Sequence, residues 1–378
     1  MRCQEQQRLS FSGSMGPESN EKPIVIVHGA NKHFGPRHAT SIDLYTYDCV
    51  AHSRFCNRSI VVCRALDEPF RGVETAFYDG GKSRRSTFNA IRHSLAEIDP
   101  ALIVVQQQAR IASRLAQHFH YVPVLLTSHE FIPPPKIWFS RIKRVRRMRR
   151  LSGMIFVSEA CRSSFLKDWP EFDAPTHAVP NGLDFAGWNP EIEREKTILF
   201  VGRMAPAKGV LELALALETV LPEFRDWKTC FICNRINKFP DYADQVRATL
   251  HNIHDQSQLM ENQPNNVVKR CMERAAIVVV PSRWQEPFGR TALEAFAGGA
   301  ALITTGTGGL AEIVGDDAII EPDLSRQALG SALQKLIEND ALRESLSRRG
   351  RKRGESLFDI RKVSRRLDDI YANHLESE

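Results

Sequence analysis

Short, uninterrupted apolar runs alternate along the chain with longer segments whose apolar residues recur at helical spacing. Runs of this kind in the first half lie at 23–28, 59–63, 102–106, 122–127 and 153–158. Continuous apolar residues are typical of parallel strands that helices cover on both faces. The segments 86–97 and 109–119 between these runs have helical length, so the first half predicts a parallel α/β sheet.

The same rhythm restarts after a turn-rich segment, 176–195, which contains Pro180, Asn181, Gly182 and Pro190. New strand-like runs follow at 197–202, 228–232, 276–281 and 300–304. We therefore expect an α/β fold of two Rossmann-like, doubly wound domains that face each other across a cleft. The expected divisions are a disordered leader at 1–21, an N-terminal domain at 22–180, a C-terminal domain at 181–358 and a terminal amphipathic helix at 359–378.

The terminal helix is expected from apolar residues at helical spacing, and it could pack back across either domain. These residues are Ile360, Val363, Leu367, Ile370 and Tyr371.

Composition narrows the possible classes of protein. The 378 residues are 42% hydrophobic and 25% charged, with 51 Lys and Arg against 45 Asp and Glu, which gives a net charge of +6. These values exclude fibrous and globally disordered chains. The apolar runs are strand-sized and far shorter than the roughly 20 residues of a membrane-spanning helix. The polar leader does not resemble a signal peptide.

The eight cysteines are scattered and predict no disulfide framework, which favours a cytosolic compartment. Cys230 and Cys233 have the spacing of a zinc or redox pair, but no second pair accompanies them. Their apolar neighbours predict that both pack in the core.

The segment 281–294 carries the strongest candidate chemistry. It follows a predicted buried strand, at the edge where doubly wound sheets bind ligands. Phe288 and Gly289 then open a helix, whose free amides suit a phosphate. Glu286 lies before that helix and Glu294 within it, so the two carboxylates could bind two hydroxyl-bearing parts of one ligand. The alternative is a capping acid and a solvated helix glutamate.

This segment resembles the signature of the family-4 retaining glycosyltransferases, also called glycosyl transferases group 1, which have two facing Rossmann-like domains (the GT-B fold). The resemblance rests on two glutamates with seven residues between them, preceded by Pro-Ser and followed by Gly298-Gly299. Three further segments match the family in order: the diphosphate-binding Val201-Gly202-Arg203 with Lys208-Gly209, the interdomain turn 180–184, and the glycine loop and helix 307–314.

The resemblance implies roles for these residues. Arg203 and Lys208 would neutralise the leaving diphosphate, as two cations after a strand are suited to do. Glu294 would bind the ribose, and Glu286 the transferred sugar. The remaining donor-binding residues would be Gly202, Phe288, Gly289, Arg290, Gly308, Gly309 and Leu310. Two cations and a helix terminus can replace a metal, and no Asp-x-Asp motif is placed to hold one, so metal-independent transfer without a cofactor is expected.

The acceptor side is assigned to the N-terminal half by resemblance. The family often has a Gly-Gly pair after the first strand. This chain lacks it, and Gly29 and Gly35 are expected to do part of that job. His129 matches a histidine found at the family's cleft, where it would contact the donor sugar or the reacting centre. The alternative is a strand-end histidine bonded to backbone. No nucleophile with an activating base stands out, which fits a reaction on one face of the sugar.

The stretch 136–150 combines cations with apolar residues at near-helical spacing, among them Ile137, Phe139, Ile142 and Val145. Such a helix could lie on an anionic membrane or bind an anionic acceptor. A solvated basic face and nucleic-acid binding are alternatives, although no base-reading motif is present. The cations assigned to this patch are Arg141, Lys143, Arg144, Arg146 and Arg147. A second basic run, 348–353, is predicted to be a solvated helix end.

Together these features predict a retaining glycosyltransferase that moves a hexose-type sugar from a nucleotide-diphosphate sugar to a lipid-linked or saccharide acceptor. Lipopolysaccharide or surface-polysaccharide biosynthesis is the expected context, at the cytoplasmic face of the inner membrane. The alternatives are a sugar-nucleotide epimerase on the same scaffold and a non-catalytic protein that binds sugar nucleotides or polyanions.

Overall fold

The computed structural model describes residues 21–29, 34–37, 39–65, 68–79, 83–135, 137–189 and 194–376. The leader expected at 1–21 lies outside these residues, except for Glu21. Part of the loop after the first strand, 30–33, also lies outside them. Within the described residues, none of the helices combines the length and the apolar character needed to cross a bilayer.

The chain forms two compact units. The first takes Met1–Val157, Cys161–Gly182 and Arg361–Glu378, and the second takes Ser158–Ala160 and Leu183–Ile360. The end of the chain thus belongs to the first unit.

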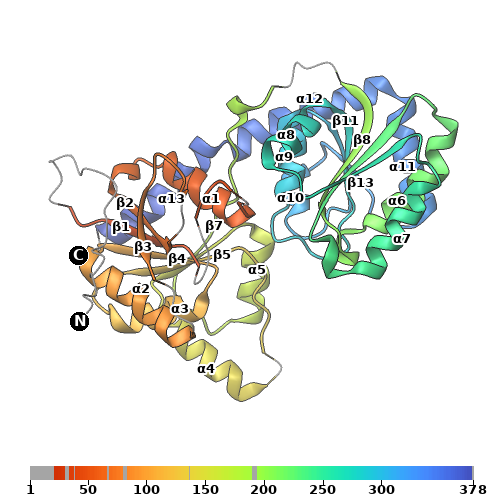
Figure 1. The fold of residues 1–378 in the computed structure, drawn as a ribbon. Coiled ribbons are helices and arrows are strands. Elements are labelled where there is room, and N and C mark those ends of the chain that lie inside the picture. Colours follow the sequence, from red (N-terminus) through yellow and green to blue (C-terminus); the bar gives the residue numbers. More distant parts are fainter. Residues whose placement is uncertain are drawn as a thin grey trace, which may run out of the picture. The chain divides into compact units, whose positions relative to one another are not determined.

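The first unit is built on a seven-stranded parallel sheet in the order β3-β2-β1-β4-β5-β6-β7 (Figure 1). Its strands are β1 (Ile24–Val27), β2 (Ser59–Arg64), β3 (Glu74–Tyr78), β4 (Leu102–Gln106), β5 (Val124–Ser128), β6 (Gly153–Phe156) and β7 (Thr176–Ala178). The helices are α1 (Ser41–Ala51), α2 (Arg84–Ile98), α3 (Ala109–His118), α4 (Trp138–Met148), α5 (Glu159–Asp168) and α13 (Ile360–Leu375). The strand order places β1 and β4 at the centre, where every residue is buried.

Helix α13 is attached to the first unit by buried polar contacts. Asp368 accepts hydrogen bonds from Ser53 Oγ (2.5 Å) and from the Arg54 backbone N–H (2.9 Å). Ser364 Oγ donates to the Cys49 carbonyl just inside the C-terminus of α1.

The second unit contains a six-stranded parallel sheet in the order β10-β9-β8-β11-β12-β13. Its strands are β8 (Glu195–Arg203), β9 (Lys228–Asn234), β10 (Ser257–Glu261), β11 (Ala275–Val280), β12 (Ala301–Thr304) and β13 (Ile319–Ile320). Helices α6 (Val210–Val220), α7 (Pro240–His251) and α11 (Arg326–Glu338) lie on one face of the sheet. Helices α8 (Asn265–Arg274), α9 (Arg290–Gly298), α10 (Leu310–Val314) and α12 (Asp340–Phe358) lie on the other face (Figure 1).

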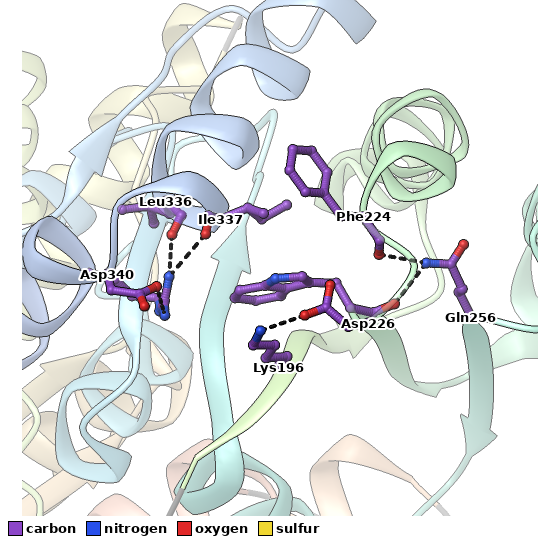
Figure 2. Close-up of polar contacts among 9 residues, drawn as sticks. Lys196, Phe224, Asp226, Gln256, Leu336, Ile337 and Asp340 are labelled. Carbon is purple, nitrogen blue, oxygen red and sulfur yellow. Dashed lines mark hydrogen bonds and ion pairs between the residues drawn. The ribbon is translucent and has the colours of Figure 1, made fainter.

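Buried polar side chains join these elements in the second unit (Figure 2). Gln256 Nε2 donates to the carbonyls of Leu221 (3.0 Å), Phe224 (2.9 Å) and Trp227 (2.9 Å), and so fixes the turn before β9. Arg343 Nη1 donates to the Leu336 carbonyl at 2.6 Å and satisfies the C-terminus of α11. Lys196 and Asp226 form an exposed ion pair near the same turn.

The predicted fold class is confirmed, since both sheets are parallel and helices cover them. The core packing predicted for Cys230 and Cys233 is also confirmed, because both thiols are buried and burial raises their pKa to about 12. The prediction for 348–353 is correct only in part: Arg348, Arg349 and Lys352 are exposed, but the run is not a helix end. This run lies inside α12, where Arg351 and Arg353 donate to the carbonyls of Ala297 and Ile313, so two of its cations connect elements instead of facing solvent.

Candidate functional site

Three loops gather at one edge of the second sheet. Strands β8, β11 and β12 are neighbours and parallel, so the loops after their carboxyl ends meet there. The Arg283 N–H donates to the Ala207 carbonyl (2.9 Å), which links the loops after β8 and β11. The Gly309 N–H donates to the Glu286 carbonyl (2.7 Å), which links the loops after β11 and β12. The sequence-predicted donor residues on these loops are therefore brought together.

Glu286 is the buried acid of this edge, with 7% of its surface exposed. Its Oε1 forms an ion pair with Lys208 Nζ and accepts a hydrogen bond from Ser282 Oγ at 2.6 Å. The lysine compensates the cost of burying the carboxylate. The cation predicted for phosphate and the acid predicted for the sugar are thus paired with each other.

Trp284 lies against both predicted phosphate-binding cations. Lys208 Nζ lies 5.3 Å from the centre of the indole ring, and the Arg203 guanidinium carbon lies 5.8 Å from it. Such cation–π contacts hold the cations near the ring without neutralising their charge. Within the described residues no carboxylate pairs with Arg203, so its charge is available to an anion.

Glu294 lies in the first turns of α9, where Arg290 Nε donates to its Oε1 at 2.9 Å. The N-cap residue of α9 is Gly289, so no N-cap side chain accepts a hydrogen bond from the backbone N–H groups of the first turn. Phe288 is buried and packs edge-on against Phe358, so only its backbone is placed to meet a ligand.

Gly308 and Gly309 at this edge have a packing role that the sequence did not predict. A Cβ on Gly308 would lie 2.3 Å from the Glu286 carbonyl oxygen, and one on Gly309 would lie 2.6 Å from the Pro287 carbonyl oxygen. Both glycines therefore let two loops approach each other, and the space that a Cβ would fill is occupied by protein backbone. Similarly, Leu310 is buried against Gly289, and a Cβ on Gly202 would meet the Phe200 ring.

In the first unit, His129 directly follows β5 and is half-buried. Its Nε2 lies 2.8 Å from Gln106 Oε1, and its backbone N–H donates to Gln107 Oε1 at 2.6 Å. The Tyr45 ring packs edge-on against the imidazole at 4.8 Å. These contacts fix the ring at the carboxyl edge of the sheet.

Gly29 and Gly35 are both buried, and Gly29 lies two residues after the end of β1. Gly29 has a φ of +35°, and the preceding His28 is fully buried, with its Nε2 2.6 Å from Asp43 Oδ1. Burial alone would raise the pKa of Asp43, but hydrogen bonds from His28 and the Thr40 amide outweigh it and hold that pKa below its ordinary value. This pair orders the start of the loop.

The predicted basic patch lies on α4, but one of its members, Arg141, is paired with an acid of the same unit. Arg141 donates two hydrogen bonds to the Glu171 carboxylate (3.0 and 2.9 Å) and one to the Asp168 carbonyl, so its charge is compensated. Lys143, Arg144, Arg146 and Arg147 are exposed. Val145 packs partly against the core, whereas Ile137, Trp138, Phe139 and Ile142 are exposed, by 65%, 65%, 68% and 47%.

Some site residues were missed at the level of sequence. Trp284 and Ser282 lie within the recognised segment, but nothing in their spacing indicates contact with Lys208 or Glu286. Gln106 and Gln107 end β4, and the pairing of β4 with β5 that brings them to His129 is visible only in the sheet. In the described part of the chain, no cluster of three His, Cys, Asp or Glu side chains is arranged to hold a metal ion.

Comparison with known proteins gives a family match for residues 187–353, to the model described as glycosyl transferases group 1. Among related sequences, a putative glycosyltransferase of Bacillus subtilis, YtcC, is 25% identical over 277 residues, which is 67% of each chain. The α-maltose-1-phosphate synthase of Mycobacterium tuberculosis is 24% identical over 69% of this chain and 76% of its own length.

Solved structures share the fold over nearly the whole chain. Sucrose-phosphate synthase from Thermosynechococcus elongatus superposes with a TM-score of 0.77 at 18% identity, covering 95% of this chain and all of the other. Anabaena HepE, solved in complex with UDP, gives a TM-score of 0.76 at 16% identity, covering 93% of this chain and all of the other. The segment 187–353 therefore matches the family that the sequence predicted, the glycosyl transferases group 1, and the described units have the fold of solved glycosyltransferases.

Proposed function

We propose that the chain transfers a hexose-type sugar, with retention and without a metal, from a nucleotide-diphosphate sugar to a lipid-linked or saccharide acceptor. The observation that carries this proposal is the grouping of Arg203, Lys208, Glu286 and Glu294 at one edge of the second sheet. Two cations and two carboxylates on one edge suit a ligand that has both a diphosphate and hydroxyl groups. The UDP found with Anabaena HepE supports the same donor class.

In this proposal the second unit binds the donor. The diphosphate pairs with both Arg203 and Lys208, so Lys208 leaves Glu286. The released Glu286 carboxylate then accepts hydrogen bonds from the sugar hydroxyls. Glu294 accepts hydrogen bonds from the ribose. The donor thus exchanges the internal ion pair for two intermolecular contacts.

The reaction breaks the bond between the anomeric carbon and the phosphate oxygen, and forms a bond from that carbon to the acceptor oxygen on the same face. The departing phosphate oxygen takes the proton of the acceptor hydroxyl. Arg203 and Lys208 stabilise the charge that develops on the diphosphate, which is the main catalytic contribution. His129, at the carboxyl edge of the first sheet, is assigned to a hydrogen bond with a substrate sugar.

We further propose that α4 holds the protein on an anionic membrane surface. Trp138, Phe139 and Ile142 would enter the interface between headgroups and acyl chains, and Lys143 and Arg146, which lie on the same side of the helix, would each add about 1 kcal/mol near the surface. This favours a lipid-linked acceptor and a role in lipopolysaccharide or surface-polysaccharide synthesis at the cytoplasmic face of the inner membrane.

The test is product analysis by NMR, with EDTA present, for a panel of nucleotide sugars and acceptors. A glycoside with the anomeric configuration of the donor is expected. A C2-epimerised nucleotide sugar formed without acceptor would instead establish the epimerase alternative, and a product of inverted configuration would contradict the proposed mechanism.

A further inference from the structure

A cavity of about 690 Å³ lies in the first unit and has no role in the function proposed so far. It opens at the carboxyl edge of the sheet, where its wall includes Gln107, which follows β4, and Ser128, which ends β5. The first residues of α2 and α3 and the second half of α4 complete it.

Cations dominate the polar part of this cavity. Arg84, Arg110, Arg144 and Arg147 line it, with Glu130 as the acid among the described lining residues. Arg144 donates to the Pro133 carbonyl at 3.1 Å, and in the described part of the chain no carboxylate pairs with any of the four arginines. Guanidinium groups that are not paired with an acid and converge on one space are suited to a phosphate, because each can donate two parallel hydrogen bonds to it.

The rest of the wall is apolar. Phe131, Ile132, Met148 and the run Pro133–Pro134–Pro135 lie beside the arginines. A small inorganic anion would leave this surface uncovered, whereas a phosphate attached to an apolar group would cover it.

The cavity adjoins the histidine assigned to the reaction. Gln107, in its wall, accepts a hydrogen bond from the His129 N–H, and Ser128 and Glu130 flank His129 in the chain. Gln107 has a φ of +64°, a strained conformation for a residue with a side chain, and its own N–H is held by the Thr127 carbonyl at 2.8 Å. Strain held in this way is typical of functional sites.

Helix α4 connects this cavity to the surface proposed to contact the membrane. At about 100° per residue, Arg144, Arg147 and Met148 share one face of the helix, and Trp138, Phe139 and Ile142 share another. One face thus forms the cavity wall while the other presents exposed apolar side chains.

From this arrangement we infer that the cavity binds the phosphate of a lipid-borne acceptor, with the arginines on the phosphate and the apolar wall on the first carbons of the lipid. That the ligand of this cavity is the acceptor rests on the proposed function.

The test measures binding by calorimetry to the full chain without donor, using farnesyl diphosphate, glucose 6-phosphate and inorganic phosphate as probes. Wild type is expected to bind farnesyl diphosphate more tightly than the two soluble phosphates. The double variant Arg84→Gln/Arg147→Gln is expected to bind it roughly 10- to 100-fold more weakly, since each substitution removes a charge-assisted contact. The matched control, Arg85→Gln/Lys167→Gln, removes two exposed charges of the same unit that do not line the cavity, and should bind as wild type does.

Equal loss in the control variant, or unchanged binding in the cavity variant, would overturn the inference. Glucose 6-phosphate bound as tightly as farnesyl diphosphate would overturn the lipid-borne source. Nucleotide-sugar binding is measured on the same samples. Nucleotide-sugar binding depends on the second unit and should be equal in all variants. If wild type binds no nucleotide sugar, the proposed function is refuted, while the measured binding of phosphates to the cavity still stands.

Discussion

The ion pair between Lys208 and Glu286 predicts a stability change that depends on which partner is removed. The side chains are only 18% and 9% exposed. In Lys208→Met, the buried carboxylate keeps the hydrogen bond from Ser282 Oγ but loses its counter-charge. Breaking a buried pair in this way costs about 3–5 kcal/mol, and partial exposure of the lysine places the expected cost near 3 kcal/mol.

The opposite substitution should cost less. Glu286→Gln leaves the more exposed lysine, which still lies against the Trp284 ring. The double variant Lys208→Met/Glu286→Gln has no buried charge at this position, and replacing both partners of a buried pair is often nearly neutral. The double variant should therefore be more stable than Lys208→Met alone.

The assay is differential scanning calorimetry of the full chain, with hydrogen exchange of β11 to assign the transition of the second unit. A cost of about 3 kcal/mol lowers the transition of a unit of this length by roughly 6–12 °C. Lys196→Met is the control, because it removes an exposed ion pair of the same unit and should leave the transition nearly unchanged. Equal shifts for Lys196→Met and Lys208→Met, or a double variant no more stable than Lys208→Met, would refute the reasoning.

Three other consequences can be measured. Gly308→Ala should displace the Glu286 loop and weaken donor binding. Gly72 has a similar positive φ, but nothing lies within 4 Å of a Cβ placed there, so Gly72→Ala should cost backbone strain alone. Calorimetric titration with donor separates the two variants, and equal donor affinity in both would contradict the loop-contact argument. Gln256→Leu should destabilise the second unit by about 1–3 kcal/mol by removing the donor to three carbonyls, and an unchanged urea midpoint would show that these contacts contribute nothing. Burial lowers the pKa of both His177 and His374 below the ordinary 6.5, and the charges of Arg162 and His177, respectively, lower them further. The folded state therefore binds fewer protons than the unfolded state, so the first unit should lose stability as pH falls below about 6.5. The variant His177→Asn/His374→Asn should flatten the pH dependence of the unfolding free energy.

The strands that the sequence did not reveal share a position in the fold. Strands β3 and β7 are the edges of the first sheet, and β10 and β13 are the edges of the second. An edge strand pairs on one side only and is less covered by helices, so it does not need a continuous apolar run. In strand β3, for example, only Thr75 and Tyr78 are buried and the other three residues are half-buried, and β7 is half-buried throughout.

The candidate site shows a similar limit. Glu286 and Lys208 were identified because each lies in a local motif after a strand. Their ion pair joins residues 78 positions apart, and the bidentate contact of Arg141 with Glu171 joins residues 30 apart. Such contacts depend on how strands and helices pack, and no local pattern encodes them.

The most direct test of the central claim is calorimetric titration of the full chain with a panel of nucleotide-diphosphate sugars in EDTA, for wild type, Glu294→Ala and the exposed control Glu338→Ala. The account predicts that wild type and the control bind one donor equally and that Glu294→Ala loses most of that affinity. Binding that requires a divalent metal, or that Glu294→Ala leaves unchanged, would contradict it.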